Sequence, residues 1–360
     1  MRWPWQRKSS KDQLIVSWYA GTFAFVRASI NADGLFNIQQ AGVARQGADS
    51  MDDFVRRLQA LGLKGREVKV MLRQEQYQLL QIEAPTVPPE ELRSAARYQI
   101  RDMVQSHIDD ITLDVMRVGD GQQKSQGHLF VVAATNAMVR EVLNLGKALD
   151  WTIPVIDIQE MAQRNLQNAL ALRDARVERA NAALVLVEGH QAVLTISAND
   201  ELFYTRRLEL PEGFMDMTWS EAREEASKVE EGFSPVEEYV PHHAGGAASS
   251  YGGGFSTSPN TVGAVADGGV DQLQRFLVEV QRSLDLWDRS WSNMPLAGLR
   301  VYAGARTREL ADWLSRDLGQ VVLTLDIEGQ FSGLESIPVE DQAICLPLLG
   351  VLLRTENRKL

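Results

Sequence analysis

The chain has 360 residues, of which 44% are hydrophobic and 24% charged, and a formal net charge of −11. This length suits two globular domains with a sizeable core. No apolar run reaches the roughly 18 residues of a membrane-spanning helix, and no basic stripe indicates a nucleic-acid partner.

Residues 1–12 are expected to form a flexible N-terminal tail. They include basic residues and two tryptophans, but neither the apolar stretch nor the cleavage site of a signal peptide. The single cysteine, Cys345, lies in an apolar run, so it excludes an internal disulfide and indicates a reducing compartment. We therefore expect a cytoplasmic protein.

A strand, a glycine turn and a second strand follow one another twice in the chain. The first set covers residues 14–30 with Gly21 in the turn, and the second covers residues 182–197 with Gly189. Glycine in such a turn lets backbone N–H groups approach a phosphate closely. Two such hairpins, a domain length apart, indicate a duplicated α/β fold.

Strands and helices alternate between the two hairpins, which favours an α/β layer architecture. A helix is expected after Pro88, because proline suits a first helical turn and Glu90 and Glu91 complement the helix dipole. Another helix is expected after Asn136, a suitable N-cap residue. The strands expected around these helices cover residues 67–72, 77–83 and 128–134.

Residues 213–270 differ in composition from the rest of the chain. Between Pro211 and Val270 there are ten acidic residues against two basic ones, a net charge of −8. The second part of the segment is rich in glycine and serine, and such a sequence cannot bury enough apolar surface to offset the entropy of ordering. We expect a disordered insertion here. His242 and His243 are not expected to bind a metal ion, because no cysteine lies near them.

A strongly amphipathic helix is expected to begin at Asp271, after the insertion. The last helix, at about residues 342–354, contains Pro347, so we expect it to begin or kink there. The elements expected between these helices are a strand at 299–303, a turn at Gly304, a helix at 307–318 and a strand at 321–325.

Four short segments carry a resemblance that covers residues 14–354 apart from the insertion. They are residues 87–98 (VPPEELRSAARY), 110–115 (DITLDV), 279–284 (EVQRSL) and 346–354 (LPLLGVLLR). In their order and spacing they are similar to motifs of the PilM family of type IV pilus assembly proteins. The branch that they resemble most is that of the MshI proteins, which act in the biogenesis of the mannose-sensitive haemagglutinin (MSHA) pilus.

This resemblance implies an α/β fold of the actin-like ATPase (ribonuclease H-like) type, which is duplicated and carries a ferredoxin-like subdomain in its first half. The first half then covers residues 13–180, with the subdomain at about 67–134. The second half covers residues 181–354, with the disordered insertion at about 213–270. Residues 355–360 form a C-terminal tail.

The resemblance also implies a nucleotide pocket between the halves, in which ATP and Mg²⁺ bind. The residues that match this pocket are Gly21, Thr22, Glu188, Gly189 and Gly304. Tyr19 and Val187, however, stand where the family carries the aspartates of its two turns, and Ala305 replaces a second glycine. Since a carboxylate is needed to hold Mg²⁺, we expect hydrolysis to be lost and no catalytic residue to remain. Binding of nucleotide without hydrolysis stays open.

For function, the resemblance implies an adaptor at the cytoplasmic face of the inner membrane. Members of the family bind the cytoplasmic N-terminal peptide of a single-pass, PilN-like membrane protein in a groove between the first-half core and the small subdomain. They link this partner to the assembly ATPase. Arg97, Tyr98 and Arg101 lie on the outer side of the helix that the resemblance places near the groove, so we expect them to contact the peptide.

Two other functions stay open at this point. One is a working ATPase of the same fold, in which Glu188 takes the place of the missing aspartate. The other is the cytoplasmic part of a secretion-platform protein, which needs a membrane-spanning helix after the domain. The lost aspartates argue against the first, and the sequence up to Leu360 shows no such helix. We therefore favour the adaptor.

Overall fold

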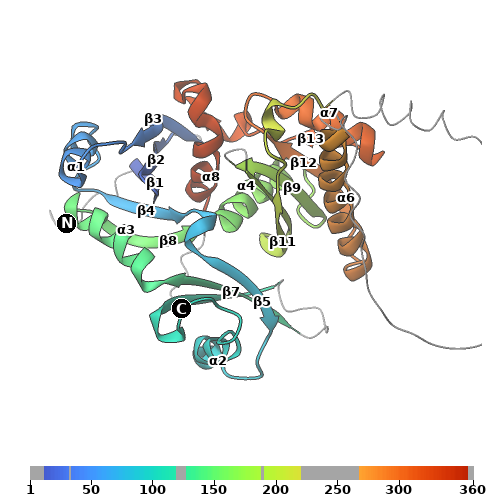
Figure 1. Ribbon diagram of the computed structural model, residues 1–360, viewed down its shortest axis with the longest axis horizontal. Coiled ribbons are helices and arrows are strands. Elements are labelled where there is room, and N and C mark those ends of the chain that lie inside the picture. The colour runs from blue at the N-terminus through green and yellow to red at the C-terminus, as the bar shows by residue number, and fades with distance from the viewer. Residues whose placement is uncertain (1–11, 32–33, 119–126, 188–189, 220–266, 356–360) are drawn as a thin grey trace, which may run out of the picture.

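The computed structural model describes residues 12–31, 34–118, 127–187, 190–219 and 267–355 (Figure 1). Two large sheets lie side by side, with helices between and around them, and a smaller sheet lies below the first of them in this view. The outer parts of both expected tails and most of the expected insertion, residues 220–266, lie outside the described residues.

The first large sheet has the strand order β14-β3-β2-β1-β4-β8. Its first three strands along the chain form an antiparallel meander, and β4 and β8 run parallel to β1. The strands are β1 (Asp12–Tyr19), β2 (Thr22–Ile30), β3 (Phe36–Arg45), β4 (Glu67–Leu72), β8 (Thr152–Ile158) and β14 (Phe331–Ser332).

The second large sheet repeats this plan with the order β11-β10-β9-β12-β13. Again three antiparallel strands are followed by two strands that run parallel to the first of them. The strands are β9 (Ala180–Val187), β10 (Gln191–Ala198), β11 (Glu201–Glu209), β12 (Leu296–Tyr302) and β13 (Val322–Thr324). The repeated topology confirms the predicted duplicated α/β fold.

Two helices join the halves, because each lies on the sheet of the other half. Helix α4 (Gln159–Arg173) follows β8 but packs on β9, β10 and β11, and helix α8 (Gln342–Leu352) packs on β1, β2 and β3. The two helices also contact each other between the sheets (Figure 1). Helix α8 begins at Gln342 and runs through Pro347, so it does not begin at the proline.

The remaining long helices cover the outer faces of the sheets. Ser50 caps α1, and Thr135, one residue before the expected Asn136, caps α3 with its hydroxyl group. Helix α6 begins at Asp267, four residues before the expected start. The helices are α1 (Met51–Ala60), α3 (Asn136–Ala148), α6 (Asp267–Ser290) and α7 (Thr307–Leu318).

The small unit is a three-stranded antiparallel sheet with the order β5-β7-β6, and one helix, α2, covers one of its faces. It has the β-α-β-β order with which a ferredoxin-like fold begins. The strand at 67–72, expected to open the unit, is β4 of the first large sheet, so the small sheet begins only at Gln78. Its elements are β5 (Gln78–Glu83), α2 (Leu92–Gln99), β6 (Ile111–Arg117) and β7 (His128–Thr135).

The first residues of the expected insertion belong to the packed core of the second half. Phe214 and Trp219 are almost completely buried and pack together, with ring centroids 5.1 Å apart. The expected insertion therefore begins later than its composition predicts, because the tertiary contacts of these two aromatic residues outweigh the acidic and polar sequence around them. Phe214 and Trp219 belong to the same hydrophobic core as the buried side chains of α6 and α7.

Two ionisable groups in the core between the halves, the buried Cys345 and the half-buried Tyr302, predict a dependence of stability on pH. Burial raises the pKa of Cys345 to about 12, with a further contribution from Asp341, and burial raises the pKa of Tyr302 to about 12. The unfolded chain would lose both protons near their ordinary pKa values of 9.0 and 10.0. The contribution of these groups to stability is therefore complete below pH 9 and lost as the pH rises toward 12. Urea unfolding of Tyr302→Phe should show a weaker decline over this range than the wild type, and equal declines would contradict the expectation.

Candidate functional site

The turn between β1 and β2 has the geometry that the sequence predicts. Ala20 and Gly21 both have positive φ angles, +46° and +75°, and Thr22 pairs with Tyr19 across the two-residue turn. The carbonyl of Gly21 accepts a hydrogen bond from the backbone N–H of Gln46 at 2.7 Å. This hydrogen bond ties the turn to the residue that follows β3 in the same half.

The turn after β12 is bonded mainly to the chain around it. Gly304 has a φ of +57°, and its carbonyl accepts from the hydroxyl and the N–H of Thr307. Next to it, the Arg306 guanidinium lies 3.8 Å from the ring centroid of Trp219 and donates to the carbonyls of Met215 and Met217. This side of the expected pocket is therefore packed against the segment that precedes the insertion.

The other two residues of the expected nucleotide pocket, Glu188 and Gly189, lie outside the described residues. Whether the three turns meet around one pocket is therefore not described, and the nucleotide pocket stays a prediction. In the described part of the chain there is no group of three or more His, Cys, Asp or Glu side chains that could hold a metal ion.

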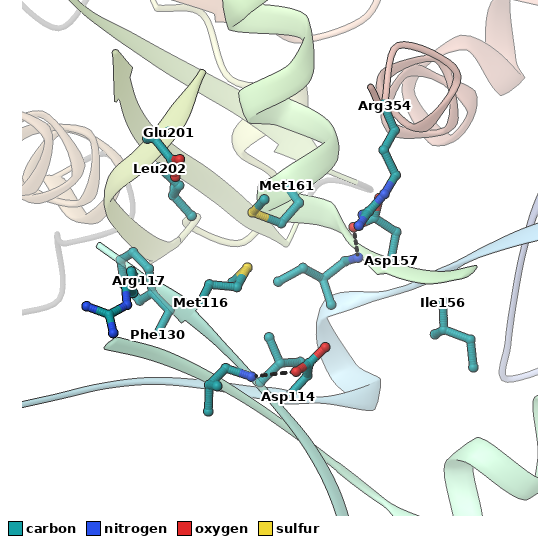
Figure 2. Close-up of a pocket in the computed structure, with 13 residues that line it drawn as sticks. Asp114, Met116, Arg117, Phe130, Ile156, Asp157, Met161, Glu201, Leu202 and Arg354 are labelled. Atoms are coloured by element: carbon teal, nitrogen blue, oxygen red, sulfur yellow. Dashed lines mark hydrogen bonds and ion pairs between the residues drawn. The ribbon is translucent and has the colours of Figure 1, made fainter. Parts of the chain in front are cut away.

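A groove lies where the small unit meets the rest of the molecule (Figure 2). It encloses a cavity of about 150 Å³, and its walls come from both halves: β6 and β7 of the small unit, β8 and the start of α4, and the start of β11. Met116 and Met161 point toward each other across it, from the small unit and from α4 (Figure 2). The other apolar side chains that line it are Phe130, Val132, Ile156, Ile158 and Leu202.

Charged side chains close the ends of this groove. Asp157 is only 3% exposed, and its carboxylate accepts hydrogen bonds from Arg354 at 2.7 Å and from the backbone N–H of Ile158 at 2.9 Å. Asp114 forms an ion pair with Arg93 at 3.0 Å. Arg117 lines the rim and forms no ion pair with any residue that the structure describes. The groove is thus apolar inside and charged at its ends.

Two of the strands beside the groove are edge strands. β8 is the last strand of the first large sheet, and β6 is the last strand of the small sheet. An edge strand leaves a row of backbone N–H and C=O groups that can pair with an added strand. An apolar cavity next to such edges suits a short extended peptide with an apolar side chain.

The three residues expected to bind a partner do not line this groove. Alternate residues of a strand point to opposite faces of its sheet. On β6, Ile111 and Leu113 face α2, whereas Met116 faces the groove. Helix α2, which carries Arg97 and Tyr98, therefore lies on the far face of the small sheet, and Arg101 follows just after the end of the helix. Tyr98 is 79% exposed, and Arg97 donates to the carbonyl of Ile108.

A polar cluster beside the groove, with Tyr77 and Glu160 buried and Arg207 half-buried, is not evident from the sequence. Tyr77, Glu160 and Arg207 come from three distant parts of the chain and contact one another. No local pattern connects them, because their contact depends on the crossing of α4 over the second sheet. Residues 159–167 of α4 are all buried although most of them are polar, so apolar spacing does not mark Glu160 as buried.

Several solved structures are similar to this chain in fold. One is a PilM–PilN type IV pilus biogenesis complex, with 17% identity, 95% of this chain and 98% of that chain covered, and a TM-score of 0.62. Another is a Bacteroides thetaiotaomicron protein of actin-like ATPase fold and unknown function, with 8% identity, 90% and 95% covered, and a TM-score of 0.45. A third is the cytoplasmic domain of EpsL, an inner-membrane component of the type II secretion system of Vibrio cholerae, with 15% identity, 55% and 71% covered, and a TM-score of 0.39.

No protein-family model and no curated protein matches the sequence. The repeated strand order and the likeness along almost the whole chain show a duplicated actin-like ATPase fold. Within the residues that the structure describes, none of the helices combines the length and the hydropathy required to cross a bilayer.

Proposed function

We propose that this protein is an adaptor of type IV pilus assembly that binds the cytoplasmic N-terminal peptide of a single-pass, PilN-like membrane protein. The observation that carries the proposal is the apolar groove between the small unit and the two halves, bordered by the edge strands β6 and β8. Support comes from the likeness in fold to a protein solved in a PilM–PilN complex.

The finer parts of the proposal rest on the resemblance in sequence. On that resemblance we propose that the protein belongs to the MshI branch and acts at the cytoplasmic face of the inner membrane, between the membrane partner and an assembly ATPase. The groove favours Met116, Met161 and Leu202 as residues that contact the peptide. Arg97, Tyr98 and Arg101 lie too far around the small sheet for this groove, so any contact that they make belongs to a different surface.

The proposal is tested by binding of synthetic peptides. Fluorescein-labelled peptides that cover the cytoplasmic N-terminus of the PilN-like protein of the same organism should bind the full chain saturably in fluorescence anisotropy. A peptide of the same composition in scrambled order is the control. Equal anisotropy with the native and the scrambled peptide would show that no specific peptide binds and would refute the proposal.

The same protein is expected not to hydrolyse ATP. Tyr19 leaves the first turn without a carboxylate, so Mg²⁺ and the attacking water lack the group that would organise them. A phosphate-release assay with millimolar ATP and Mg²⁺ should give the rate of a protein-free sample. Phosphate release that disappears in Glu188→Gln would contradict this expectation and favour a working ATPase. Calorimetric titration on the same sample separates binding from hydrolysis.

A further inference from the structure

The connection between the first large sheet and the small unit is held in place on both of its sides. It runs through residues 73–77, between β4 and β5. On one side, the side chain of Gln76 accepts from the backbone N–H of Arg73 at 2.8 Å and donates to the carbonyl of Trp18 at 3.0 Å. These bonds tie the connection to the end of β1.

On the other side, the connection is tied to α4 and to the second half. The hydroxyl of Tyr77 donates to one carboxylate oxygen of Glu160, which stands in the first turn of α4. Arg207 of β11 donates to the other oxygen from Nη2 at 3.0 Å and from Nε at 3.2 Å. It also donates to the carbonyl of Gln74 at 2.8 Å, and its guanidinium lies 4.8 Å from the Tyr77 ring centroid.

The hydrogen bonds from Tyr77 and Arg207 replace those that the Glu160 carboxylate would make with water in the unfolded chain. Glu160 is completely buried, and a buried carboxylate needs paired and hydrogen-bonded partners. Burial and the Glu160 carboxylate raise the pKa of Tyr77 well above its ordinary value. The phenol therefore stays protonated and donates a hydrogen bond to Glu160. The side-chain amide of Gln74 is buried without a hydrogen-bond partner among the described residues. The backbone carbonyl of Gln74, which accepts from Arg207, is therefore the group that holds this part of the connection.

The cluster stands directly behind the groove. Met161, which points into the cavity, is the next residue after Glu160, and Leu202 of the groove wall lies on the same strand as Arg207. The opposite wall, with Met116 and Phe130, belongs to the small unit that the connection carries. We propose that Tyr77, Glu160 and Arg207 anchor the small unit against α4 and β11 and thereby set the width of the peptide groove.

The three side chains are positioning residues, since none of them lines the cavity. The anchor itself does not depend on the peptide, whereas its effect on the groove rests on the proposed function. Two variants, Tyr77→Phe and Arg207→Met, test the proposed anchor, because each removes part of the contact with Glu160. Arg206→Met is the matched control, because Arg206 is the neighbour of Arg207 on β11 but pairs with Glu279 of α6. Circular dichroism and urea unfolding check that each variant is folded, and Tyr77→Phe keeps the test available if Arg207→Met does not fold.

The first readout is the distance between spin labels at Ser94→Cys in α2 and Asp312→Cys in α7, measured by double electron–electron resonance. Both positions are exposed, and the native Cys345 is buried and keeps its proton, so it stays unlabelled. We expect one narrow distance distribution in the wild type and in Arg206→Met, and a broadened distribution in Tyr77→Phe and Arg207→Met. The same narrow distribution in all four proteins would overturn the anchor.

The second readout is peptide affinity by anisotropy. Tyr77→Phe and Arg207→Met should bind the PilN-like peptide about tenfold more weakly than the wild type, while Arg206→Met binds as the wild type does. Broadened distances with unchanged affinity would refute the effect on the groove. If the wild type binds no peptide, the proposed function fails, and the distance measurement still decides whether the anchor exists.

Discussion

Met116→Glu is expected to weaken strongly the affinity of the groove for the PilN-like peptide. Met116 lies on the edge strand β6 and points into the cavity toward Met161 (Figure 2). A carboxylate at this position would have to be desolvated by the apolar side chain of the peptide, which is costly when no partner compensates it. We expect affinity to fall at least tenfold, or about 1.4 kcal/mol.

Two further variants make this result specific to the cavity. Thr112→Glu adds the same charge on the same strand, four residues earlier and outside the groove lining. Met116→Leu keeps an apolar side chain of similar size, a change that packed sites tolerate well. Both should bind the peptide nearly as the wild type does. If Met116→Glu binds with wild-type affinity, or if Thr112→Glu weakens binding equally, the peptide does not occupy this cavity.

Gly350→Ala is expected to destabilise the whole molecule. A Cβ atom on Gly350 would lie 2.1 Å from the carbonyl oxygen of Ala162 and 2.6 Å from its carbonyl carbon. These are backbone atoms of α4, so α4 and α8 would have to move apart where they cross. The hydrogen bond from Asn165 to the carbonyl of Gly350, at 3.0 Å, would be disturbed as well.

Because both central helices join the two halves, the strain cannot be absorbed at a free end. We expect the free energy of unfolding in urea to fall by about 3 kcal/mol or more, at the upper end of what overpacking costs. Gly329→Ala is the control, since its Cβ would meet only the Arg173 side chain, at 3.7 Å. A loss below about 0.5 kcal/mol in Gly350→Ala, the size of an ordinary surface substitution, would show that the helices cross less closely than described.

The duplicated fold was readable from the sequence because its evidence is local. Each half begins with a strand, a glycine turn and a second strand, and hydrogen bonds in such a hairpin join residues that are neighbours in the chain. The helices were readable for the same reason, from apolar spacing and end residues. Their ends differ from the expected ones by a few residues, as at α6, which begins at Asp267 instead of Asp271, because a pattern of apolar spacing specifies a helix end less sharply than its middle.

The local sequence of β4 does not indicate to which of the two sheets this strand belongs. An apolar strand at Glu67–Leu72 can pair in either sheet, and the choice depends on β1 and β8, which lie far away in the chain. The same holds for Phe214 and Trp219, whose apolar contacts come from α6 and α7. The composition around them indicated a loop, and tertiary packing overrode it.

By itself, the sequence determined the two hairpins and the order of the main helices and strands, because each depends only on residues adjacent in the chain. The tertiary structure alone decided which face of the small sheet is open. Strand alternation turns Met116 toward α4 and leaves Arg97 and Tyr98 on the far side. The tertiary structure also decided the contact of Tyr77 with the Glu160–Arg207 ion pair. These residues are far apart in the chain, so only long-range packing brings them together.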